Sequence, residues 1–180
     1  MTRTVESGLA GLVLAGGRSS RMGEDKAAIH WRGQTLLDHA CALLQRVGCE
    51  RIHVLGRPEQ PGGIADAERF AGPARALLGA VNRLHQDTRR LVVVPVDMPC
   101  LQVEDVTRLL DEPGVQACFY RDHPVPFVAG VESLSLVPAQ TRSLKTLLSA
   151  AGASSMDIPD GRRHAFANIN TPADIAGLAP

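Results

Sequence analysis

Hydrophobic and polar positions along the chain follow two alternating patterns. Short apolar runs at residues 11–14, 51–55 and 91–96 have the length of strands buried on both faces, and Gly16-Gly17 follows the first run. Between the runs, apolar residues recur at helical spacing over 35–47 and 75–86, and again over 103–110. The pattern therefore predicts strands that alternate with helices, as in a βαβ sheet.

The last third of the chain is less regular. Strands are predicted at residues 115–119 and 126–131, and a helix at 143–151. Residues 171–174, Thr-Pro-Ala-Asp, have the signature of a helix start, with a capping residue, a proline and a carboxylate in order. We expect one α/β domain over residues 1–180, with a mostly parallel central sheet flanked by helices.

Composition narrows the class of protein and of partner. Hydrophobic residues make up 44% and charged residues 21%, which is typical of globular proteins. Lys+Arg and Asp+Glu both number 19, so no global positive field favours nucleic acid or a membrane surface, and neither is an expected partner. The apolar run at 9–15 is too short for a signal or membrane segment, so we expect a cytoplasmic location.

The four cysteines show neither a C-x-x-C pair nor a histidine at zinc-ligand spacing. They are predicted to be reduced, mostly buried thiols: Cys41, Cys49, Cys100 and Cys118.

Candidate chemistry is concentrated in the loop after the first predicted strand. From Leu14 to Lys26 the sequence reads L-A-G-G-R-S-S-R-M-G-E-D-K. Two glycines after a buried strand let backbone N–H groups approach a phosphate chain at a distance that a Cβ would block. Arg18, Arg21 and Lys26 add cations that can neutralise a leaving pyrophosphate. The chain has neither a Walker A sequence nor G-x-G-x-x-G, which disfavours P-loop enzymes and dinucleotide binding.

Asp97 is the second candidate position. It follows the predicted strand at 91–96, and ligands of βαβ sheets bind beyond the carboxyl ends of the strands. The glycine pair and Asp97 are therefore expected at one edge, with Asp97 as a ligand of Mg²⁺; the alternative is a helix cap. Asp25 is expected to hold the loop by pairing with Arg21 or Lys26.

These motifs resemble a known family. Besides the loop, they comprise Pro95-Val96-Asp97-Met98-Pro99, Arg121-Asp122-His123-Pro124 and Asn168-Ile169-Asn170-Thr171-Pro172. In this order they are similar to the molybdenum cofactor guanylyltransferases, over nearly the whole chain. The resemblance implies a Rossmann-like fold of the nucleotide-diphospho-sugar transferase type.

The resemblance also implies an activity and its partners. GMP would pass from GTP to the terminal phosphate of molybdopterin or Mo-molybdopterin, with in-line attack and release of pyrophosphate. Further candidate partners are other cofactor-biosynthesis or molybdoenzyme-maturation proteins.

Roles follow from the same resemblance. Arg21, Lys26 and Asp97 would be catalytic, with Asp97 binding Mg²⁺ on the α-phosphate. His123, Asn168 and Asn170 would line the acceptor side; a packing role for His123 and a turn-stabilising role for both asparagines are the alternatives. The nucleotide would be held by Leu14, Ala15, Gly16, Gly17, Arg18, Ser19, Lys26, Asp66 and Asp97.

Two departures from the family pattern concern the base. The family usually carries an Asn at the end of the second strand, facing the nucleotide, where this chain has Leu55-Gly56-Arg57. Asp66 is the candidate for reading guanine if one or two residues are deleted before Gly72-Pro73. A relative that uses CTP or another phosphorylated acceptor is therefore one alternative, and a non-catalytic nucleotide-binding relative is another.

Overall fold

A seven-stranded sheet organises the computed structural model, which describes residues 7–16, 25–66, 72–170 and 174–175. The strand order is β5-β4-β1-β6-β8-β7-β9. Four neighbouring pairs are parallel, whereas β8 runs antiparallel to both β6 and β7. The predicted α/β fold with a mostly parallel sheet is therefore confirmed. The strands are β1 (Leu9–Leu14), β4 (Arg51–Leu55), β5 (Gly63–Ile64), β6 (Arg90–Pro95), β7 (Ala117–Tyr120), β8 (His123–Gly130) and β9 (Ser154–Met156).

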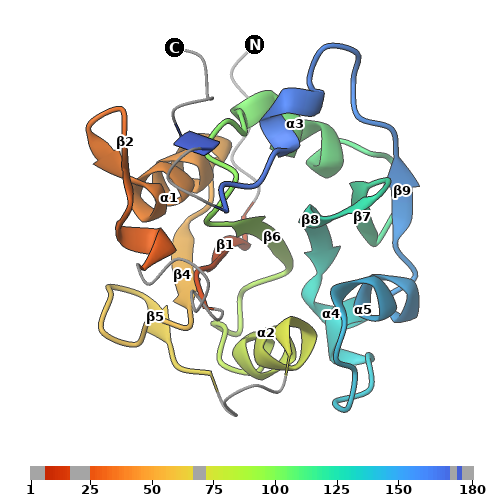
Figure 1. The fold of residues 1–180 in the computed structure, drawn as a ribbon. Coiled ribbons are helices and arrows are strands. Elements are labelled where there is room, and N and C mark those ends of the chain that lie inside the picture. The colour runs from red at the N-terminus through yellow and green to blue at the C-terminus, as the bar shows by residue number, and fades with distance from the viewer. Residues whose placement is uncertain (1–6, 17–24, 67–71, 171–173, 176–180) are drawn as a thin grey trace.

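Helices cover both faces of the sheet (Figure 1). On one face lie α1 (Leu36–Val47) and α3 (Val103–Leu110); on the other lie α2 (Pro73–Val81), α4 (Val131–Ser135) and α5 (Leu144–Ala150). Successive strand residues point to opposite faces, so Val92 and Val94 join the α1 core while Leu91 and Val93 join the α2 core. This two-sided burial explains why β6 is a continuous apolar run.

The predicted helices are present, and one of them has different ends. The helix predicted at 35–47 is α1, which Thr35 caps together with Asp38 and which Gly48 ends at φ 99°. The helix predicted at 75–86 spans Pro73–Val81 instead. Beyond it the amides of Arg83 and Leu84 donate to carbonyls three residues back, which tightens the chain into turns and ends the helix early.

Several short elements were not predicted from the sequence. They are β5, β9, α4 and an antiparallel hairpin of β2 (His30–Trp31) and β3 (Gln34–Thr35). Each is five residues long or shorter, and so brief a segment carries no readable periodicity. The strand predicted to reach 131 ends at Gly130, because Val131 already begins α4. Of the predicted helix start, residues 171–173 lie outside the described residues, and Asp174 and Ile175 are helical.

All four cysteines are free thiols, as predicted. Cys49 and Cys118 are buried and Cys41 and Cys100 are half-buried. Burial raises the pKa of the Cys41, Cys100 and Cys118 thiols, which keeps them protonated near neutral pH. None of the helices in the described ranges has the length and apolar character needed to cross a membrane.

Candidate active site

The candidate site lies where three parallel strands end. β1 stands between β4 and β6. Past the strand ends, the Val96 amide donates to the Leu14 carbonyl at 3.2 Å, and the Ala15 amide donates to the Leu55 carbonyl at 3.1 Å. These bonds hold the three chain exits together. Gly16 and Asp97, each two residues past a strand end, therefore leave the sheet at one edge.

Lys26 connects the end of the loop to Asp97. Its Nζ lies 3.2 Å from Asp97 Oδ2 and 3.0 Å from Asn170 Oδ1. The three residues are called the Lys26 cluster below. The side chains of Lys26 and Asp97 are 23% and 21% exposed, so the ion pair is shielded yet still open to a ligand. An ammonium that shares one edge with a carboxylate and an amide oxygen can bind a phosphate beside a divalent cation.

Asn170 reaches the cluster from a segment remote in sequence. The Ile169 amide donates to the Asp97 carbonyl at 2.8 Å, and the Ile169 side chain is buried. The Asn170 amide donates to Asp174 Oδ2 at 2.7 Å. Asn168 and Asn170 are exposed on either side of Ile169; Asn170 contacts Lys26, whereas Asn168 makes no hydrogen bond with another described residue.

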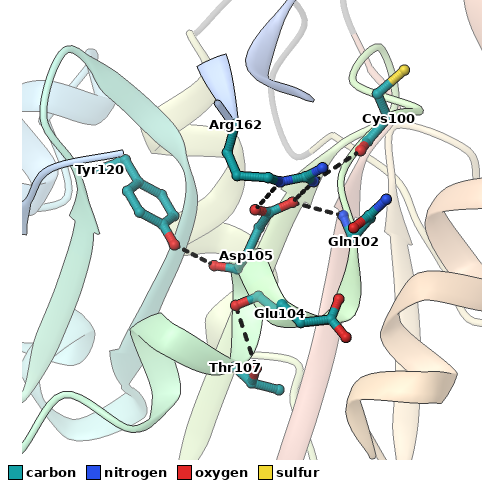
Figure 2. A network of polar contacts seen from close by, with 7 residues as sticks. All are labelled: Cys100, Gln102, Glu104, Asp105, Thr107, Tyr120 and Arg162. Carbon is teal, nitrogen blue, oxygen red and sulfur yellow. Dashed lines mark hydrogen bonds and ion pairs between the residues drawn. The ribbon is translucent and has the colours of Figure 1, made fainter. Parts of the chain in front are cut away.

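A buried ion pair fixes the chain just before this segment, as Figure 2 shows. Arg162 Nε donates to Asp105 Oδ1 at 3.0 Å, and Arg162 Nη2 donates to Asp105 Oδ2. The Asp105 side chain is only 2% exposed, and it also accepts from the Gln102 amide at 2.8 Å, which caps α3. Its hydrogen bond to Arg162 raises the pKa of that guanidinium. The pair thereby ties the segment that leads to Asn170 onto α3.

His123 lies at the same edge because β8 runs opposite to β6. The antiparallel register pairs Val93 with Phe127, so the start of β8 lies beside the end of β6. The His123 ring packs at a tilt on Phe166, with centroids 5.3 Å apart, and Phe166 packs edge-on against Tyr120 at 4.8 Å. Among the described residues, His123 has no polar contact with the Lys26 cluster. The contacts favour packing, and acceptor binding by His123 stays a prediction.

The glycine turn touches the end of β4. Gly56 has φ 88°, and a Cβ there would come within 2.5 Å of the Gly16 Cα, so glycine is required for this backbone approach. Asp66 Oδ2 lies 3.3 Å from where a Cβ on Gly16 would stand. Partial burial raises the pKa of the Asp66 carboxyl. The structure thus brings Asp66 to the glycine turn.

The other end of the loop is bound near the same place. Arg57 Nη1 and Nη2 donate to the two carboxylate oxygens of Asp25. Asp25 Oδ1 also accepts from the Ala27 amide at 3.1 Å and caps the 3₁₀ turn η1 (Lys26–Ala28). Asp25 was expected to pair with Arg21 or Lys26. Lys26 binds Asp97 and Asn170 instead, and among the described residues Arg57 is the partner of Asp25, while Arg21 lies outside the described residues.

Part of the predicted site cannot be placed. Gly17, Arg18, Ser19 and Arg21 lie outside the described residues, and their roles stay predictions. The structure does bring together Gly16 with Asp66, and Lys26 with Asp97 and Asn170.

Asp97 is the residue best placed to hold a divalent cation. In the described ranges there is no group of three or more His, Cys, Asp or Glu that could hold a metal ion. Mg²⁺ uses one or two carboxylates together with substrate phosphates and water, and needs no cage made of protein alone. One carboxylate, that of Asp97, at the carboxyl edge of the sheet fits that kind of site.

Comparisons with known proteins find similar chains. A family model described as MobA-like NTP transferase domain matches residues 11–157. The chain is 34% identical to the molybdenum cofactor guanylyltransferase of Xanthomonas euvesicatoria, over 97% of this chain and 96% of that protein. It is 28% identical to the protein of the same name from Rhodobacter capsulatus, over 93% of each chain.

Solved structures show the same fold. Molybdopterin-guanine dinucleotide biosynthesis protein A from Archaeoglobus fulgidus has a TM-score of 0.68 at 18% identity, over 93% of this chain and 95% of that one. A nucleotidyl transferase from Methanothermobacter has a TM-score of 0.71 at 16% identity, over 94% and 95%. At such identities the likeness concerns the fold alone.

Proposed function

Because the chain belongs to the MobA-like NTP transferase domain family, we propose that it is a Mg²⁺-dependent molybdenum cofactor guanylyltransferase. A phosphate oxygen of molybdopterin or Mo-molybdopterin attacks the α-phosphorus of GTP. A new P–O bond forms, the bond between the α- and β-phosphates breaks, and pyrophosphate leaves. The proposal is supported above all by the Lys26 cluster, which gathers a cation and a carboxylate at the exits of β1 and β6.

The chemistry of the cluster suits this reaction. Phosphoryl transfer depends mainly on positioning and on neutralising developing charge. The Lys26 ammonium stabilises the negative charge that grows on the pyrophosphate, and Gly16 offers a backbone that phosphate oxygens can approach closely. Asp97 would hold Mg²⁺, which polarises phosphoryl oxygens when bound. The attacking phosphate is already an anion, so no side chain has to remove a proton.

The position of Asp66 supports guanine as the base. A carboxylate accepts two hydrogen bonds side by side, and guanine offers N1–H and its 2-amino group as adjacent donors. Cytosine offers a single amino donor on its pairing edge. A carboxylate beside the glycine turn is therefore better matched to GTP than to CTP.

The decisive measurement is pyrophosphate release from each of the four NTPs, with and without molybdopterin, in Mg²⁺ or in EDTA. We expect pyrophosphate release only when GTP, molybdopterin and Mg²⁺ are all present. Turnover with CTP in place of GTP would support the cytidylyl alternative, and GTP binding without any release would support the non-catalytic one.

Replacing Asp97 with Ala tests the metal role directly. Turnover is expected to fall roughly a thousandfold, because the metal would lose its protein ligand, while some GTP binding remains. Asp157→Asn is the matched control, because the Asp157 side chain is 78% exposed and pairs with Arg121 on the surface. Unchanged turnover in the Asp97 variant would remove this residue from the mechanism.

A further inference from the structure

Both ends of the loop between β1 and η1 are attached to three consecutive residues. We call Leu55, Gly56 and Arg57 the β4 corner. On the β1 side, the Ala15 amide donates to the Leu55 carbonyl, and the Gly56 backbone touches Gly16. On the η1 side, Arg57 binds both carboxylate oxygens of Asp25. The corner therefore fixes the points where the loop leaves the sheet and where it returns.

The second attachment bears directly on Lys26. Asp25 is the residue that caps η1, and η1 begins at Lys26. One Asp25 oxygen accepts both from Arg57 and from the Ala27 amide, so the guanidinium orients the same carboxylate that orients the turn. From that turn the Lys26 side chain reaches Asp97 and Asn170. A path of hydrogen bonds thus runs from Arg57 through the Asp25 carboxylate to the Ala27 amide, inside the turn that begins at Lys26.

We propose that Arg57 is a positioning residue of the transfer reaction, which sets the Lys26 ammonium against Asp97 by orienting Asp25. The inference rests on the proposed function for the identity of the reaction, while its geometric part concerns anion binding alone. The β4 corner is where the family resemblance led us to expect an Asn that faces the nucleotide. In this chain the guanidinium faces Asp25 instead.

Arginine suits this role and lysine does not. The planar guanidinium holds two carboxylate oxygens at once and so fixes the rotation of the carboxylate, whereas an ammonium is a point charge without that constraint. The side chains of Arg57 and Asp25 are 23% and 38% exposed. Ion pairs with this much exposure contribute little to overall stability, so the main consequence of losing Arg57 should appear at the Lys26 cluster.

A double-mutant cycle on the full chain tests the path. Affinities for GTP and for inorganic triphosphate are measured by calorimetry in wild type, Arg57→Gln, Lys26→Ala and the double variant, with pyrophosphate release as a second readout. Arg57→Gln is expected to weaken both affinities on the order of tenfold, because Lys26 is misplaced. In the Lys26→Ala background the Arg57→Gln change should weaken the two affinities by less than about twofold, because the group that Arg57 positions is gone.

Three further variants sharpen the cycle. Arg57→Lys keeps the positive charge but loses the two-pronged guanidinium, so its affinities for GTP and triphosphate should lie between those of wild type and Arg57→Gln. Asp25→Asn keeps a capping oxygen but removes the carboxylate charge, so it should weaken both affinities as much as Arg57→Gln does. It tests the same path from the other partner if Arg57→Gln folds poorly. Glu59→Gln is the control: Glu59 lies 3.8 Å from Arg57 but is 58% exposed, and its loss should leave both affinities unchanged.

The outcomes separate this inference from the proposed function. If Arg57→Gln weakened the affinities equally in wild type and in Lys26→Ala, the positioning role would be overturned, because Arg57 would then contact the nucleotide itself. Unchanged affinity and turnover in Arg57→Gln and Asp25→Asn, with a wild type that releases pyrophosphate from GTP, would also overturn it and leave the function standing. A wild type that shows the predicted coupling in triphosphate binding, yet never releases pyrophosphate, would sink the function and support the positioning role.

Discussion

Two arginine–aspartate pairs hold segments onto the carboxyl edge of the sheet, and they differ in burial. Arg57 with Asp25 attaches the loop, and the Asp25 side chain is 38% exposed. Arg162 with Asp105 attaches the segment that leads to Asn170, and the Asp105 side chain is 2% exposed. The two arginines are about equally exposed, so the pairs differ in the carboxylate, which is partly open to solvent in Asp25 and buried in Asp105.

Burial decides what each pair contributes. A buried charge that loses its partner is strongly destabilising, whereas an exposed pair contributes little to stability. The Arg162 pair is thus expected to support the fold, and the Arg57 pair to support the geometry of the Lys26 cluster. Variants that affect stability at one pair and ligand affinity at the other would establish this division.

The largest expected effect is at the buried pair. Arg162→Ala leaves the buried Asp105 carboxylate without its guanidinium partner, and should lower the free energy of unfolding by about 4 kcal/mol. Urea denaturation measures the change. Arg121→Ala breaks the exposed pair with Asp157 in the same way and should shift the midpoint of unfolding little. Similar losses in both variants would contradict the role given to burial.

A second effect concerns pH on the same side of the molecule. Burial raises the pKa of Tyr120 to about 12, and its hydroxyl donates to the Asp105 carbonyl at 2.7 Å. Above pH 10 the unfolded chain loses the phenol proton while the folded chain keeps it, so the unfolded state is favoured. Stability should be complete below pH 10 and fall by about 3 kcal/mol at most as the pH rises to 12.

Denaturation of wild type and Tyr120→Phe between pH 9 and 12 isolates this contribution. Tyr120 is the single tyrosine in the sequence, so phenolate absorbance reports its ionisation alone. If the free energy of unfolding of Tyr120→Phe fell with pH as steeply as that of wild type, the pH dependence would belong to other groups.

The smallest effect on stability is expected at the β4 corner. Gly56→Ala should lower stability by about 2 kcal/mol and weaken GTP binding, because a Cβ would press on the Gly16 backbone at positive φ. Gly48→Ala is the matched control: φ is 99°, but nothing lies within 4 Å of the added Cβ. It should lower stability by about 1 kcal/mol and leave GTP binding unchanged. Equal GTP affinities in the two variants would show that the Gly16 contact is not needed.

Local patterns in the sequence predicted one part of this arrangement well. β1 and β6 were predicted because burial on both faces makes their residues continuously apolar, and the positions of Gly16 and Asp97 at one edge followed from parallel pairing. The predicted end of α2 was wrong, because the amphipathic pattern continues through turns that do not extend the helix.

The long-range contacts could not be predicted in this way. Arg57 lies 32 residues from Asp25, and Arg162 lies 57 residues from Asp105. An isolated arginine carries no sign of its partner, since any exposed position tolerates it. Asp66 and Asn170 were found only through the family resemblance, and the short strands β5 and β9 give too few residues to read.

The contact between Lys26 and Asn170 spans 144 residues. A ribosome therefore synthesises the lysine long before it makes the asparagine that binds it. Fragments that stop before Asn168 lack this support however well their strands have paired. The Lys26 cluster is therefore assembled only after Asn170 has been made, so its geometry depends on a segment that lies outside every strand of the sheet.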